Sequence, residues 1–149
     1  MSLTFTQARD EILTVFKTAW DAGADTAGKV VIYPDAKNQV PKTNDADSNP
    51  NLWARVSVIH DTGRQATLGG IGNRLFQREG TVTVQIFTPI GTGLSIADRV
   101  YKIVVDAFEG KTSASGNVWF RNVRVNEIGP EGSWFQTNII ADFEYDEQK

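Results

Sequence analysis

Hydrophobic residues recur along this chain with two periods, which predicts both strands and helices. Over residues 81–87 every second side chain is apolar, the pattern of a strand that buries one face. Over residues 94–108 the apolar side chains fall on one stripe of a helix. The same patterns predict the order α-β-β-β-α-β-β, with helices over 6–20 and 94–108 and strands over 29–33, 52–59, 81–87, 118–125 and 134–145.

These elements predict an α+β fold in one domain over residues 1–149, with a mostly antiparallel sheet and both helices packed on one face. Thr6 is the expected N-cap of the first helix. The face of the sheet away from the helices is expected to be polar, yet it carries Trp53, Trp119 and Trp134. The sequence leaves open whether Trp53 and Trp134 are core residues or contacts to a partner.

Two segments rich in turn-forming residues are predicted to be long loops. Residues 34–50 contain three prolines together with many Asn, Asp and Ser residues. Residues 60–79 are rich in glycine and arginine, so we expect an exposed, pliable middle, with ends that can pair as hairpin arms. A connection of this length inside a small domain usually has a function.

Length and composition indicate an ordered globular protein. The chain has 149 residues, of which 40% are hydrophobic and 22% charged. Its formal net charge of -3 disfavours a protein that coats nucleic acid through many phosphate contacts. It has no cysteine, which excludes disulfides and thiolate nucleophiles. No stretch approaches the ~20 apolar residues of a membrane helix, so we expect no membrane partner.

Candidate chemistry is sparse. His60 precedes Asp61, but no Gly-x-Ser-x-Gly elbow supplies a nucleophile, so His60 is expected to be a solvent-facing turn residue. The segment GGIGNRLFQREG lacks the Lys-Ser/Thr ending of a phosphate-binding loop. Asp35, Asp45 and Asp47 lack the spacing of an EF-hand. We therefore expect no catalytic residue, no cofactor site and no metal site.

Opposite charges are concentrated in two regions. The 60–79 segment carries Arg64, Arg74 and Arg78, whereas the last strand carries acidic residues that include Asp142 and Glu144. One hypothesis is that the basic segment of one subunit meets the acidic strand of its neighbour, the head-to-tail complementarity that closes rings. The alternatives are unrelated solvated charges, or an acidic face or edge that discourages strand pairing.

The runs REGTVTVQIFTPIGTGLSIADRVYKIVVDAFEGK and VWFRNVRVNEIGPEGSWFQTNIIADFEYDE, residues 78–111 and 118–147, resemble the phage tail terminator-like proteins of long-tailed bacteriophages. The resemblance rests on the order and spacing of the parts taken together. The positions that carry the resemblance are Arg78, Gly80, Pro89, Gly91, Gly93, Trp134, Phe135, Gln136, Phe143 and Tyr145.

The resemblance implies a non-enzymatic virion protein that forms a ring, typically of six subunits, on the last ring of the tail tube. It implies assembly in the host cytoplasm and a place at the head-proximal end of the tail. The implied partners are further copies of the chain, the tail tube protein, a head-completion protein and, transiently in the lumen, DNA. Expected contact residues are Arg64, Arg74, Arg78, Trp53, Trp134, Asp142 and Glu144, and the three arginines face DNA if their segment lines the lumen.

Three other functions remain open at the level of sequence. A head–tail connector or tail-completion subunit has a similar size and build. A small ligand-binding or enzyme domain would use a groove beside Trp53 and the 69–72 loop. A peptide-binding module would accept a strand at an open sheet edge.

Overall fold

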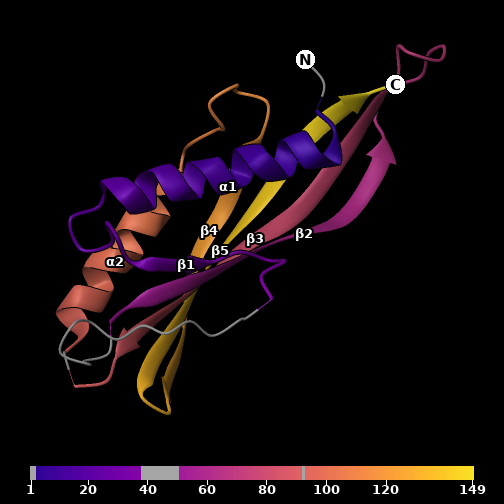
Figure 1. Cartoon of the computed structure of the whole chain (residues 1–149). Coiled ribbons are helices and arrows are strands. Elements are labelled where there is room, and N and C mark those ends of the chain that lie inside the picture. Colours follow the sequence, from indigo (N-terminus) through magenta and orange to yellow (C-terminus); the bar gives the residue numbers. More distant parts are fainter. Residues whose placement is uncertain (1–2, 38–50, 92) are drawn as a thin grey trace.

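The computed structural model describes residues 3–37, 51–91 and 93–149, and its elements follow the predicted order (Figure 1). Most of the predicted 34–50 loop, including Asp45 and Asp47, lies outside the described residues. The elements are α1 (Phe5–Ala22), β1 (Val30–Ile32), β2 (Trp53–Gln65), β3 (Leu75–Pro89), α2 (Leu94–Phe108), β4 (Trp119–Glu131) and β5 (Trp134–Gln148).

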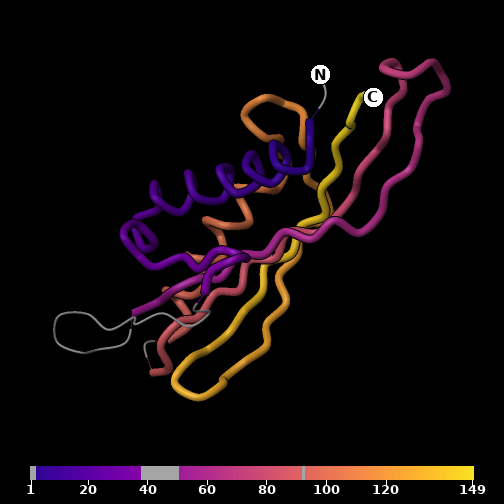
Figure 2. The backbone as a smooth tube through the Cα atoms, turned by 45° about the vertical axis from the view of Figure 1, so that its right-hand side comes forward, coloured from indigo at the N-terminus to yellow at the C-terminus, as the bar shows by residue number. Residues whose placement is uncertain are grey.

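The strands form one five-stranded sheet in the order β1-β2-β3-β5-β4. Only β1 and β2 are parallel, and the other neighbours are antiparallel. Figure 2 shows both helices on the same side of the sheet, as predicted. Because β5 lies between β3 and β4, Asp142 and Glu144 occupy a face of the sheet, and the alternative that these two residues protect a sheet edge is wrong.

The first helix begins two residues earlier than predicted. Thr4, rather than Thr6, is the N-cap, and its side chain accepts a hydrogen bond from the Gln7 backbone N–H at 3.3 Å. The Gln7 side chain in turn accepts from the Thr4 backbone N–H at 3.0 Å, which completes a capping box. The expected i+4 series is buried, with Ile12, Phe16 and Trp20 facing the core.

The core lies between the helices and the inner face of the sheet. The predicted alternation is confirmed over residues 82–86 of β3 and 139–145 of β5, where every second residue belongs to the core. The main members of the core are Ile12, Phe16, Trp20, Val56, Val82, Val84, Ile86, Val100, Val104, Phe108, Ile139, Ala141 and Phe143. This single core fixes the sheet as a rigid body on which the surface features are mounted.

Candidate assembly surfaces

The most prominent surface feature is an arm formed by residues 60–79, which projects past the body at the end of β2 and β3 (Figure 2). Much of the loop predicted for these residues is strand, and the alternative that its ends pair as hairpin arms is confirmed. Thr62 pairs with Glu79 and Gln65 with Phe76. The end of β5 also pairs with β3 as far as Leu75, so only the tip, residues 66–74, lies outside the strands.

Two of the three predicted arginines lie near the tip. The Arg64 Nε–H donates to the Gln77 side-chain oxygen at 2.8 Å. The Arg74 guanidinium lies 5.7 Å from the centre of the Phe76 ring, and its Nε–H donates to the Lys149 backbone oxygen at 3.3 Å. Within the described part of the chain, neither guanidinium is paired with a carboxylate side chain. Both charges are therefore available to a partner.

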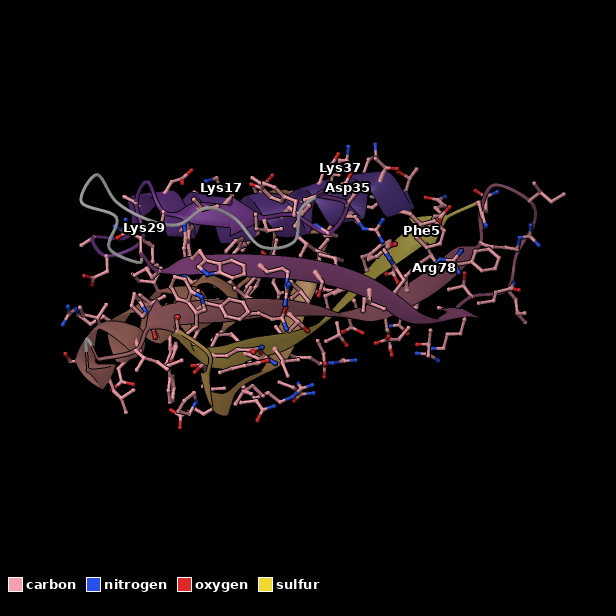
Figure 3. All side chains as sticks on the ribbon, turned by 60° about the horizontal axis from the view of Figure 1, so that its bottom comes forward. Phe5, Lys17, Lys29, Asp35, Lys37 and Arg78 are labelled. Carbon is pink, nitrogen blue, oxygen red and sulfur yellow. The ribbon has the colours of Figure 1, made fainter. Side chains whose placement is uncertain are left out.

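Arg78 has a different position, at the base of the arm. Its side chain is only 16% exposed and forms an ion pair with Glu147 at 3.4 Å. Figure 3 shows it beside Phe5, whose ring centre lies 5.3 Å from the guanidinium carbon. A second ring, Phe76, lies at 5.6 Å. Arg78 thus joins the arm to α1 and the end of β5, which restricts its contact with other molecules.

His60 lies inside β2, so the expectation of a solvent-facing turn residue is wrong. Its Nε2 is 2.7 Å from the Tyr145 hydroxyl, and its ring meets Phe5 edge-on at 4.9 Å. Burial lowers the pKa of His60, and the charges of Arg9 and Arg78 lower it further. Burial raises the pKa of Tyr145 to about 12. The protonated phenol can therefore donate to a neutral imidazole.

The outer face of the sheet carries a ladder of charges between β4 and β5. Glu144 is 3.1 Å from Arg121, and Asp142 is 3.4 Å from Arg124. Arg121 also lies 3.6 Å from Glu79 on β3. These pairs are partly exposed and contribute little stability. The two acidic residues expected at an interface thus already have partners within the chain.

The tryptophans at the other end of the sheet form an aromatic cluster. Trp53 stacks on Phe87 with 4.1 Å between ring centres, and Trp134 meets Trp53 edge-on at 6.2 Å. Trp53 is only 2% exposed, whereas Trp134 is partly exposed. Because Trp53 begins β2 and the 69–72 loop follows the other end of β2, the two form no common groove. The alternative of a small ligand-binding or enzyme domain therefore has no groove at the place proposed for it.

Sequence reasoning missed a groove between α1 and α2. Its volume is about 550 Å³, and its wall is largely apolar. The sequence does place small residues on the sides of the helices that line this groove. The groove itself, however, forms only when the two helices pack together. Its lining residues are Asp10, Glu11, Thr14, Val15, Thr18, Ala19, Ala22, Ile103, Asp106, Ala107, Lys111 and Ala114.

The described residues contain neither a cluster of metal ligands nor a membrane-spanning helix. Within residues 3–37, 51–91 and 93–149, no three His, Asp or Glu side chains are placed to hold a metal ion together. Neither of the two helices in this part of the chain is long and apolar enough to cross a membrane. The prominent features are instead an arm, a charged sheet face, an aromatic cluster and a groove.

This fold and these surfaces define a small α+β protein with a rigid body and a projecting arm. The sequence model of a family described as phage tail terminator protein matches residues 11–141, and the chain belongs to this family. The resemblance seen in the sequence is confirmed. The chain is thus a structural component of a bacteriophage tail, in a family that is not enzymatic.

Comparison with solved structures supports the fold. One solved structure superposes with a TM-score of 0.62 at 17% sequence identity, over 92% of this chain and 94% of the other. At this identity the likeness concerns the fold alone. No match was found among curated proteins.

Proposed function

We propose that this chain is the subunit of a six-membered ring that caps the head-proximal end of the tail tube. The ring stops polymerisation of the tube and presents a surface to which a head-completion protein binds. The observation that carries this proposal is the match to the tail terminator family across residues 11–141, which spans most of α1, all of α2 and most of the sheet.

The shape of the molecule supports assembly through unlike surfaces. A ring of identical subunits needs a contact in which one surface of each copy meets a different surface of the next. The arm projects from one end of the sheet (Figure 1). The groove lies elsewhere on the body, lined by residues of α1 and α2. A projecting element and a receiving surface on one rigid subunit are the parts that such a contact requires.

Transient contact with DNA is a further part of the proposal. DNA that passes through the ring meets the lumen, where positive charge favours the phosphate backbone without reading sequence. Arg64 and Arg74 are the arm residues suited to this role, because neither is paired with a carboxylate side chain in the described part of the chain. Arg78 contributes less to this DNA contact, because it forms an ion pair with Glu147 and packs against two aromatic rings.

The direct test is growth of the tail tube in vitro. Purified tube protein is polymerised with and without this chain, and tube lengths and ends are examined by electron microscopy. The proposal predicts that added protein arrests growth and that a ring of six subunits is visible at one end. Unchanged growth with bare ends would refute it. Heat-unfolded protein at the same concentration is the control.

A strand-accepting peptide module is the second candidate, favoured by one observation. Among the described residues, β1 pairs only with Trp53, Ala54 and Arg55, so the outer edge of β2 beyond Arg55 has no strand partner. Such an edge can accept an extended peptide. This candidate predicts a monomer that binds peptides by added strand hydrogen bonds, seen as new amide protection along residues 56–65. No protection by tail-protein peptides would exclude it.

A further inference from the structure

The tip of the arm carries two aliphatic side chains without cover. Leu68 is 93% exposed and Ile71 is 89% exposed, although the surrounding tip is rich in polar residues and glycine. Both residues belong to the tip, residues 66–74 between β2 and β3. Figure 2 shows this segment at the far end of a projecting hairpin. Exposed aliphatic groups placed together on a protruding element are typical of contacts with another protein.

The groove between α1 and α2 offers a matching apolar surface. Its floor is aliphatic and includes Val15, Ala19, Ile103 and Ala107. Its volume of about 550 Å³ is within the range of pockets that enclose small ligands. The groove therefore has room for two aliphatic side chains.

Charges at the two surfaces are complementary. The rim of the groove carries Asp10, Glu11 and Asp106, against a single Lys111. Asp106 pairs with Lys102 at 2.7 Å, but no ion pair in the described residues involves Asp10 or Glu11. The Glu11 Oε2 atom is buried and has no hydrogen-bond partner there.

A buried carboxylate oxygen without a donor is unfavourable, and rotation of the Glu11 side chain toward an incoming guanidinium would satisfy it. Arg64 lies just before the tip and Arg74 is its last residue, and neither is bound to a carboxylate side chain in the described part of the chain. The arm thus brings positive charge together with apolar side chains, whereas the groove has negative charge around an apolar floor.

We propose that Leu68 and Ile71 of one copy insert into the α1–α2 groove of a neighbouring copy. Arg64 and Arg74 of the inserted arm then face Asp10 and Glu11 of the receiving copy. This inference rests on the proposed ring and gives it a specific contact. The contact is heterologous, because each copy gives an arm and receives one, so repetition closes a ring when the rotation between copies allows it.

The tip does not fill the groove of its own chain. Leu68 and Ile71 are almost fully exposed, and the arm extends past the body instead of folding back over the helices (Figures 1 and 2). The occupant that fits the groove by both charge and apolar character is therefore the arm of a second copy.

Disulfide trapping tests the contact directly, because the chain has no native cysteine. An Ile71→Cys variant is mixed with a Thr18→Cys variant, whose exposed cysteine lies on the groove wall, and the mixture is oxidised with and without tail tubes. A disulfide forms only between side chains held close together. The proposal predicts a cross-linked heterodimer. The matched control mixes Ile71→Cys with Asn126→Cys, an exposed residue on β4, and is expected to give only background.

The outcomes separate this inference from the proposed function. If the parent protein forms rings but the Thr18 and Asn126 pairs cross-link equally, the arm-in-groove contact is wrong and the ring stands. If the parent forms no ring alone or on tubes, the proposed function fails and the contact fails with it. Preferential cross-linking of the Thr18 pair in ring-forming protein supports both.

A charge reversal gives an independent readout. Arg64→Glu with Arg74→Glu should abolish assembly, and mixing this variant with Asp10→Lys and Glu11→Lys protein should restore contacts between unlike copies. Restoration is measured as mixed complexes by mass. A groove that serves another ligand instead would leave assembly of the arginine variant at the parental level, which would overturn the inference.

Discussion

Gly80 lies at the base of the arm, at a position that has no room for a side chain. A Cβ atom at this position would lie 2.2 Å from the Ile59 backbone oxygen and 2.5 Å from the Phe143 ring. Neither neighbour can move easily, because one is the backbone of the paired strand and the other is a core side chain. Glycine is therefore required here by close packing.

Replacing Gly80 with Ala should lower the free energy of unfolding by about 1 to 3 kcal/mol, the usual cost of overpacking. Urea denaturation measures the change. Gly70→Ala is the matched control, because a Cβ there meets nothing within 4 Å. The control should change stability by less than about 1 kcal/mol in either direction. Equal losses in the two variants would contradict this view of Gly80.

His60 should make stability depend on pH. Its pKa in the folded protein is lowered from 6.5 by burial and by Arg9 and Arg78, whereas the unfolded chain has the ordinary value. As pH falls below about 6.5, the unfolded chain binds the proton more readily, so the free energy of unfolding decreases. This dependence disappears above 6.5 and again below the lowered pKa.

The variant His60→Gln removes this dependence while keeping a group that can bond with the Tyr145 hydroxyl. Urea denaturation at pH 7.5 and 5 should show a smaller loss on acidification in the variant than in the parent. Equal losses would show that other groups cause the acid sensitivity.

The three arginines of the arm should separate into two classes. Arg78→Ser should lower the free energy of unfolding by about 0.5 to 3 kcal/mol, because it removes an ion pair and contacts with two aromatic rings at a side chain that is only 16% exposed. Arg64→Ser with Arg74→Ser should leave stability nearly unchanged but impair assembly or DNA passage. Denaturation and counts of infectious particles measure the two effects.

Lys17→Ser with Lys102→Ser is the matched control for the pair of tip arginines, because it removes the same charge from helix positions whose side chains are 39% and 76% exposed. Normal infectivity is expected for this control. Normal infectivity of the Arg64 and Arg74 variant as well would remove the proposed roles of these arginines.

At the scale of elements, the arm is an extension of the sheet that ends in a separate tip. The Ala66 backbone N–H still donates to the Leu75 backbone oxygen at 2.7 Å, so strand pairing continues to the start of the tip. The residues beyond this bond, 67–74, contribute no member of the hydrophobic core. We therefore expect the tip to be dispensable for folding, with the loss of the backbone hydrogen bonds between Arg74 and Lys149 as its main cost.

Replacing residues 67–74 by Asn-Gly, which favours a two-residue hairpin turn, should preserve the fold and abolish assembly. The free energy of unfolding should change by less than about 1 kcal/mol, since the removed residues are outside the core. Urea denaturation and the mass in solution measure the two properties. A shortened protein that still forms rings would contradict the role of the tip.

The elements of the body could be predicted from the sequence because their patterns are local. Alternation marks β3 from Thr81 and β5 from Trp134, and the helical stripe marks α2. The strand residues of the arm, 60–65 and 75–79, could not be assigned with the same ease. The glycines and arginines of the arm favour a loop locally, whereas pairing with β2 and β5 gives the backbone of β3 its strand hydrogen bonds from Leu75 onward.

The candidate surfaces were predicted less completely, because they depend on contacts far apart in sequence. Nothing near Arg78 in the sequence indicates Glu147 as its partner. The internal position of β5 follows from strand order, and the groove follows from the packing of α1 against α2. Trp53 is buried because Phe87 and Trp134 stack around it from other strands.

At the scale of the whole molecule, the protein is a rigid body with unlike surfaces on its different sides. The helices and their groove cover one face of the sheet, the charge ladder lies on the other, and the arm projects from one end. A subunit of this design is suited to head-to-tail contacts between copies. The family match places it in the phage tail, where such contacts would close a ring.

The central claim is that the protein forms a ring that caps the tail tube. The most direct measurement is the mass of the purified protein across concentration, alone and with tail tubes, combined with electron microscopy of the tube ends. The account predicts a species of six subunits in solution or a six-membered ring on one end of each tube. A protein that stays monomeric at every concentration and leaves the tube ends bare would contradict it.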